Sequence, residues 1–138
     1  MWWIYALLSA FFAALVAVFA KVGIKGVDSD LATAIRTIVI LLIVWGIVLA
    51  KGANSQLGGL TKQNWIFLIL SGCATGLSWL FYFRALQLGE VSKVAPIDKL
   101  SVALAIILSV IFLHEKLTWQ EAVGAIFIMG GTLLLIFK

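Results

Sequence analysis

The sequence is poor in residues that ionise, cross-link or bind metals. Its 138 residues include one cysteine, one histidine and only 12% charged residues. The single Cys73 excludes an intramolecular disulfide and a cysteine-rich metal site, and His114 has no second histidine with which to hold zinc. The glycine motifs of nucleotide-binding loops and the G-x-S-x-G turn of hydrolases are also missing. We therefore expect no catalytic residue, no metal and no cofactor.

Apolar residues dominate what remains. They make up 64% of the chain, and the mean hydropathy is +1.17. A soluble domain of this size cannot bury so much apolar surface. This composition excludes a cytosolic globular enzyme, a disordered tail and a nucleic-acid-binding module, and it predicts an all-α integral membrane protein. The net charge of +4 then reflects lysines and arginines between the apolar runs, as in membrane proteins, with no nucleic acid as partner.

The hydrophobic runs predict five membrane-spanning helices within a single domain, residues 1–138. Each has about the 20 apolar residues that a bilayer requires. Asp28, Ser29 and Asp30 offer caps for the second helix, and Thr118 with Glu121 forms a capping box before the fifth. A similar Leu-Thr pair at residues 60–61 precedes the third span and indicates shared cap chemistry. The expected spans are residues 2–22, 31–50, 65–87, 94–113 and 119–137.

The basic residues encode orientation only weakly. An odd number of spans places the two termini on opposite sides, and the count favours an external N-terminus. Leaving out the four basic residues near span ends makes the count three against three, as a chain that inserts in both orientations (dual topology) would require. The N-terminal side holds Lys51, Lys62 and Lys116, and the other side holds Lys21, Lys25, Arg36, Arg84, Lys93, Lys99 and Lys138.

Five charged residues are expected at similar shallow depth on one side of the membrane: Lys21, Arg36, Arg84, Asp98 and Lys99. Charges are costly in lipid, so we expect these groups to face protein or water and to act in gating or coupling. Adjacent helical residues point about 100° apart, which predicts that Asp98 and Lys99 satisfy each other poorly. Asp98 is then expected to pair with Arg36 or Lys21. The alternative is that the basic side chains only reach lipid phosphates.

The third and fourth spans carry small and aromatic residues in their middles. Trp79, Tyr82, Ser101 and Thr75 are candidates for a substrate cavity, in which aromatic faces would hold a cationic or zwitterionic solute. Gly72 and Gly76 form a G-x-x-x-G motif typical of close helix packing. Tight packing of helices is the simpler interpretation of all these residues.

Two stretches resemble the EamA family of the drug/metabolite transporter superfamily. They are FRALQLGEVSKVAPIDKLS at residues 83–101 and FLHEKLT at residues 112–118, and Arg36 near the start of the second span also fits. The resemblance covers essentially the whole chain. It implies a transporter of small metabolites, amino acids or drugs built from one five-helix repeat, whereas most such proteins carry two inverted repeats.

A single repeat then needs a second half, because alternating access moves one inverted repeat against another. The simplest partner is a second copy in the opposite orientation, giving a ten-helix antiparallel homodimer, and the other is an inverted paralogous chain. Smaller four-helix relatives couple protons through a glutamate in their first helix. Residues 2–20 contain no acid here, so Asp98 is the candidate for coupling.

The sequence therefore predicts a secondary-active transporter in a bacterial-type inner membrane. It leaves open the solute, the direction of transport and the coupling ion. Two alternatives remain at this point. One is a flippase for a lipid-linked anionic head group, and the other is a membrane assembly subunit that transports nothing.

Overall fold

A computed structural model describes residues 1–136 of the chain, and all regular structure in that range is helical. Helices there are long and apolar enough to cross a bilayer in five places, counting α4 and α5 as one span, which confirms the predicted architecture. The elements in chain order are α1 (Trp2–Gly23), α2 (Ser29–Ala50), the 3-10 helix η1 (Ala53–Gly59), α3 (Lys62–Leu88), α4 (Val91–Asp98), α5 (Leu100–Phe112) and α6 (Trp119–Ile136).

The predicted caps of α2 and α6 are confirmed. The Asp28 carboxylate accepts hydrogen bonds from the amides of Asp30 at 2.9 Å and Leu31 at 3.1 Å. Before α6, the Thr118 amide donates to the Glu121 carboxylate at 2.8 Å, and the Glu121 amide donates back to the Thr118 hydroxyl at 3.4 Å. Each cap supplies an acceptor to amides that have no partner inside their own helix.

The third helix begins earlier than predicted, at Lys62 instead of residue 65. Thr61 caps it, because its hydroxyl accepts a hydrogen bond from the Asn64 amide at 3.2 Å. Cap chemistry thus precedes both α3 and α6, as the similar Leu-Thr pairs predicted. The last residue of the expected fifth span, Phe137, lies outside the described residues, as does Lys138 from the count of basic residues.

The fourth predicted span, residues 94–113, is confirmed as Val91–Phe112, but its helix is not continuous. The helical segment starts at Val91 and is interrupted at Lys99, which separates α4 from α5. Pro96 lies inside α4 and has no amide hydrogen with which to continue the helical hydrogen bonds. Around the break the chain makes tighter bonds, from the Lys99 amide to the Pro96 carbonyl and from the Val102 amide to the Lys99 carbonyl, both at 3.0 Å.

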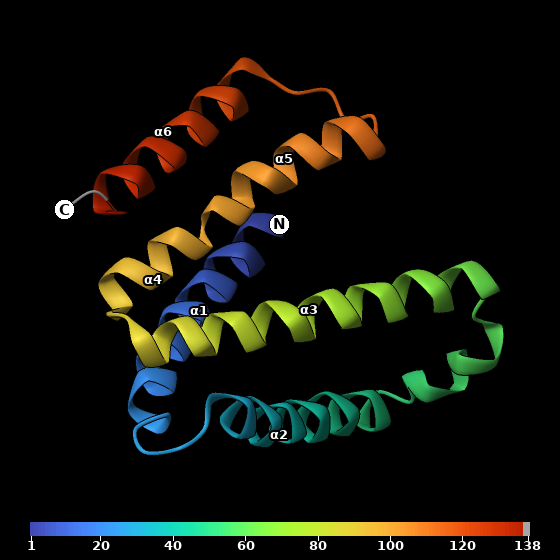
Figure 1. Ribbon diagram of the computed structural model, residues 1–138. Coiled ribbons are helices and arrows are strands. Elements are labelled where there is room, and N and C mark those ends of the chain that lie inside the picture. The colour runs from blue at the N-terminus through green and yellow to red at the C-terminus, as the bar shows by residue number, and fades with distance from the viewer. Residues whose placement is uncertain (137–138) are drawn as a thin grey trace. The chain divides into compact units, whose positions relative to one another are not determined.

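The chain divides into two compact units. The first comprises residues 1–18 together with the chain from Leu88 onward. In it α5 and α6 run side by side after the 113–118 connection, and α4 also contacts α6 (Figure 1). There the Thr132 hydroxyl of α6 donates to the Pro96 carbonyl of α4 at 3.3 Å, so α6 supplies a partner at the helix break.

The second unit is the continuous segment Phe19–Gln87. It contains the end of α1, all of α2 and η1, and nearly all of α3. Figure 1 shows α2 leading through η1 into α3, which returns toward the end of α1. Phe83 and Leu86, near the end of α3, are among its most buried side chains, at 2% and 0% exposed. The best-packed part of this unit therefore lies at the C-terminal end of α3.

Most apolar side chains along the helices are exposed. Phe12 is 60% exposed, Leu42 67% and Phe127 75%. Exposing such apolar faces to water along whole helices is unfavourable, whereas contact with the hydrocarbon of a bilayer carries no such penalty. Exposed apolar faces on helices of this length are the pattern expected of segments that face lipid.

Candidate functional site

Lys21 caps the end of α3. Its amino group donates a hydrogen bond to the main-chain carbonyl of Leu86. Leu86 belongs to the last turn of α3, where carbonyl groups have no amide partner within the helix and carry the negative end of the helix dipole. The positive charge of Lys21 therefore stabilises this helix end and ties it to the end of α1.

A second contact at the same helix end runs through Gln87. The Arg84 guanidinium donates to the Gln87 side-chain oxygen at 3.1 Å, and the Gln87 amide nitrogen donates to the Val27 carbonyl at 2.9 Å. Val27 lies in the connection between α1 and α2. Arg84 thus orients the residue that joins α3 to that connection.

Arg36 stacks on aromatic rings of α3. The central carbon of its guanidinium lies 4.0 Å from the ring centroid of Trp79 and 5.2 Å from that of Phe83. The two aromatic residues are four positions apart, so they share one face of the helix. The Nη1 atom of Arg36 is buried and has no hydrogen-bond partner among the described residues.

The structure thus brings together three of the residues that the sequence nominated. We call Lys21, Arg36 and Arg84 the basic cluster: Lys21 and Arg36 contact the last three turns of α3, and Arg84 lies within these turns. Two of them bind groups of the protein itself, Leu86 and Gln87. Arg36 differs from them, because the polar edge of its guanidinium retains a donor without an acceptor.

Asp98 and Lys99 lie in the other unit, at the break between α4 and α5. The prediction that they satisfy each other poorly is wrong, since the Lys99 amino group lies 3.1 Å from the Asp98 carboxylate. The helix is interrupted between them, and the long lysine side chain folds back onto its neighbour. The side chain of Lys99 is 53% exposed and that of Asp98 is 35% exposed, so this ion pair contributes little and breaks readily.

Asp98 also lies deeper in its span than predicted. Because α4 begins at Val91, Asp98 follows seven residues later, about 10 Å along the helix at 1.5 Å per residue. An acid at this depth in a bilayer is costly unless it faces protein or water. Its place beside a helix break, where backbone groups also need polar partners, agrees with a polar surrounding.

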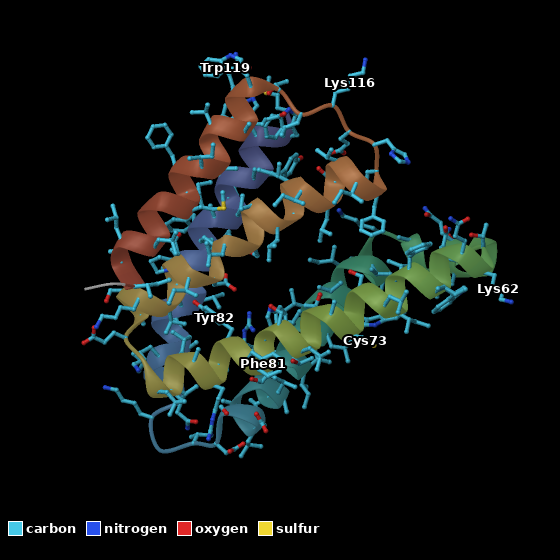
Figure 2. All side chains as sticks on the ribbon, turned by 45° about the horizontal axis from the view of Figure 1, so that its top comes forward. Lys62, Cys73, Phe81, Tyr82, Lys116 and Trp119 are labelled. Atoms are coloured by element: carbon cyan, nitrogen blue, oxygen red, sulfur yellow. The ribbon has the colours of Figure 1, made fainter. Side chains whose placement is uncertain are left out.

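The cavity candidates do not form one group within a single unit. Trp79, Tyr82 and Thr75 belong to α3 in the second unit, whereas Ser101 is an exposed residue of α5 in the first. Thr75 donates its hydroxyl to the Ser71 carbonyl at 2.9 Å, a bond within its own helix. Figure 2 places Tyr82 toward the end of α3 opposite Lys62. Arg36 covers one face of Trp79, a ring that the sequence nominated for holding a cationic or zwitterionic solute.

The G-x-x-x-G face of α3 is uncovered. A methyl group added at Gly72 or Gly76 would meet nothing within 4 Å. No other helix of the second unit therefore approaches either glycine closely. Close packing at this motif would need a surface from outside this unit.

Sequence reasoning missed three residues of this arrangement. Phe83 stacks on Arg36, Gln87 links Arg84 to Val27, and Thr132 bonds to the carbonyl at the α4–α5 break. Phe83 could have been found, because it follows Trp79 by one helical turn. Nothing in the sequence distinguishes Gln87 or Thr132 from ordinary polar residues near span ends.

A small cavity of about 150 Å³ lies in the first unit beside the α5–α6 connection. Figure 2 labels Lys116 and Trp119 at this connection. The volume is below the roughly 300 Å³ at which small-molecule sites begin. Among the described residues no group of three or more histidine, cysteine, aspartate or glutamate side chains could hold a metal ion. The cavity is lined by Ile106, Ser109, Val110, Glu115, Lys116, Leu117 and Glu121.

Five apolar spans and a polar cluster at helix ends define an integral membrane protein. The chain belongs to the EamA-like transporter family, whose model matches residues 1–137. It is therefore a membrane transporter, as the resemblance at residues 83–101 and 112–118 predicted.

Two relatives extend this assignment. A Sinorhizobium sp. protein, "Uncharacterized transporter in cobO 3'region", is 53% identical over 134 residues, which cover 97% of this chain and 95% of the relative. That relative has room for little more than the same five helices. "Uncharacterized protein MJ1333.1" from Methanocaldococcus jannaschii is 32% identical over 69 residues, half of each chain. No solved structure matches the chain.

Proposed function

We propose that this chain is one half of a secondary-active transporter and works as an antiparallel homodimer. It would move a small metabolite, amino acid or drug-like solute across a bacterial-type inner membrane by alternating access, without enzymatic chemistry. The observation that carries this proposal is the single five-span repeat of a transporter family. Alternating access requires two inverted halves, and the Sinorhizobium relative is also about one repeat long.

The exposed apolar faces support a partner. At Gly72 and Gly76 no helix of the second unit covers α3, and small-residue faces of this kind favour close helix contacts in membranes. With the four basic residues near span ends left out, three remain on each side, and this balance supports insertion in both orientations, which an antiparallel homodimer needs. An inverted paralogous chain would meet the same requirement.

Orientation can be measured directly. In a Cys73→Ser background, Ser55→Cys in η1 and Lys25→Cys in the α1–α2 connection would be labelled separately with a membrane-impermeant thiol reagent. The antiparallel homodimer predicts that each cysteine is labelled from both sides of the membrane in comparable amounts. Labelling from one side only, or cross-links that join only parallel chains, would contradict a homodimer with inverted halves.

Asp98 is the proposed gating and coupling residue, with Arg36 or Lys21 as its partner in one state. Its exposed contact with Lys99 is weak enough to be exchanged for another partner. Arg36 is the stronger candidate, because Lys21 already donates to Leu86 while Arg36 Nη1 needs an acceptor. Opening would then consist of separating these charges when a solute or a proton arrives.

The test of coupling is Asp98→Asn in proteoliposomes, with Glu90→Gln as the control at another acid of the same unit. Asp98→Asn is expected to abolish coupled uptake or efflux while dimers still form, and Glu90→Gln is expected to retain activity. Full coupled transport in Asp98→Asn would remove the gate. Movement of labelled lipid without any movement of soluble solutes would instead indicate a flippase. Absence of flux together with co-purification of another membrane protein would indicate an assembly subunit.

A further inference from the structure

Arg36 carries a buried polar atom that the described protein does not satisfy. Its Nη1 is shielded from solvent and has no hydrogen-bond partner. A buried donor without an acceptor is unfavourable, and more so on a charged group. Native proteins rarely keep such a group unless a ligand, an ion or water completes it. The missing partner must be an acceptor.

The stacking on two aromatic rings fixes the direction in which the Arg36 guanidinium presents its N–H bonds. The Trp79 ring lies 4.0 Å from the guanidinium carbon, and Phe83 lies on the same helical face at 5.2 Å. Rings that cover the face of a guanidinium leave the N–H bonds at its edge, in the plane that binds carboxylate or phosphate oxygens through paired hydrogen bonds. The aromatic contacts therefore orient the group for an oxyanion.

The charges of the second unit favour a negative ligand. Lys21 and Arg84 contact the same end of α3 as Arg36. The two acids between residues 19 and 87 have roles at the start of α2, where Asp28 caps the helix and Asp30 accepts from the Ser29 hydroxyl. A site with several cations and a shielded surrounding attracts an anion from solution.

We propose that Arg36, held in place by Trp79 and Phe83, binds a carboxylate or phosphate group of the transported solute. Trp79 and Phe83 act as positioning residues, and the anion accepts its hydrogen bond from Nη1. This assignment rests on the proposed transport function only in calling the anion part of the transported solute. Binding of an anion at Arg36 itself needs no transport. It replaces the cationic solute that the aromatic residues alone suggested, since Arg36 covers one face of Trp79.

Binding can be tested with simple oxyanions as probes. Purified protein in phosphatidylcholine nanodiscs would be titrated with sodium acetate and with sodium phosphate, and sodium chloride would hold the ionic strength constant. The readout is the midpoint of thermal unfolding, which rises when a ligand binds the folded state only. Wild type is expected to show a saturable rise with at least one of the two probes.

Variants distinguish specific binding at the stacked Arg36 from a general effect of positive charge on the unfolding midpoint. Arg36→Gln is expected to lose the rise, and Lys25→Gln, at an exposed cation outside the basic cluster, is expected to keep it. Arg36→Lys keeps the charge without the planar edge and is expected to bind about tenfold more weakly or worse. Trp79→Leu retains Arg36 and is expected to weaken binding by removing its orientation. If Arg36→Gln does not fold, Arg36→Lys and Trp79→Leu decide the question.

Three results would overturn the site. The first is that neither probe raises the unfolding midpoint of wild type, and the second is an equal rise of the midpoint in Arg36→Gln. The third, where Arg36→Gln does not fold, is undiminished binding in both Arg36→Lys and Trp79→Leu. Repeating the titration in phosphatidylglycerol nanodiscs identifies the source of the anion. If the lipid abolishes the effect of both soluble probes and itself stabilises wild type but not Arg36→Lys, the site holds a lipid phosphate and the solute assignment is wrong.

Arg36-dependent binding without solute flux in proteoliposomes would instead refute the transport proposal and leave the site in place.

Discussion

Lys21 and Leu86 lie 65 residues apart in the sequence, yet the amino group of one donates to the main-chain carbonyl of the other. Leu86 is fully buried, so its carbonyl cannot turn to water. A lysine that was expected either to gate a pore or to reach lipid phosphates thus satisfies the end of a neighbouring helix. The same contact fixes the end of α1 against the end of α3, the helix that contains Arg84 and contacts Arg36.

Removal of the Lys21 amino group is expected to destabilise the protein. Lys21→Met keeps the length of the side chain and removes the donor, which leaves a buried carbonyl unpaired at a helix end. We expect the free energy of unfolding in mixed micelles to fall by about 1 kcal/mol. Lys25→Met is the control, because Lys25 is exposed in the following connection. Equal losses in the two variants would show that Lys21 acts only as a surface charge.

Thr132 is expected to stabilise the break between α4 and α5. Its hydroxyl contacts the Pro96 carbonyl at 3.3 Å and the Ile128 carbonyl of its own helix at 2.8 Å. Thr132→Val removes the one hydroxyl hydrogen that these two carbonyls share, with little change in shape. Thr75→Val removes only the bond within its own helix and serves as the matched control. We expect Thr132→Val to cost about 1 kcal/mol more than Thr75→Val in the unfolding free energy. A difference near zero would mean that the contact with Pro96 contributes nothing.

The two caps with similar sequences are expected to differ in strength. Thr118 and Glu121 exchange two hydrogen bonds, whereas Thr61 only accepts one, from the Asn64 amide. Thr118→Ala combined with Glu121→Ala removes both of these bonds and is expected to lower the unfolding free energy by about 1 kcal/mol, within the range known for such caps. Thr61→Ala is expected to cost less. The reverse order would indicate that Glu121 adds nothing to its cap.

Local chemistry made much of the fold predictable from the sequence. The spans follow from runs of apolar residues, and the caps at Asp28 and Thr118 follow from short-range hydrogen bonding. The break at Lys99 was missed because hydropathy averages over a whole window and does not register one residue. Pro96 carried the necessary signal, since a proline inside a span removes a backbone donor.

The candidate site was predictable only in part, because its contacts cross between helices. Unusual charges within apolar spans identified Lys21, Arg36 and Arg84. The sequence could not specify that Lys21 would bind a carbonyl near the end of α3, or that Arg36 would stack on Trp79 and leave one nitrogen unpaired. Those outcomes depend on helix packing. Packing sets distances of a few ångströms between residues that are 40 or more positions apart.

The uncovered face of α3 leads to a prediction about association. If a second copy packs against Gly72 and Gly76, a large side chain at Gly72 will hold the two helices apart. Gly72→Ile is expected to weaken dimerisation in a bilayer by about tenfold, measured by energy transfer between labelled chains. It is expected to leave monomer unfolding nearly unchanged, because a Cβ there meets nothing within 4 Å.

Gly46→Ile in α2 is the matched control, since Gly46 also has no neighbour within 4 Å of its Cβ position and lacks a second glycine one turn away. We expect this variant to dimerise as wild type does. Equal weakening by both substitutions would point to a general effect of bulky residues on insertion. Unchanged dimerisation of Gly72→Ile would show that the glycine face of α3 contacts lipid, and the second half of the transporter would then have to pack elsewhere.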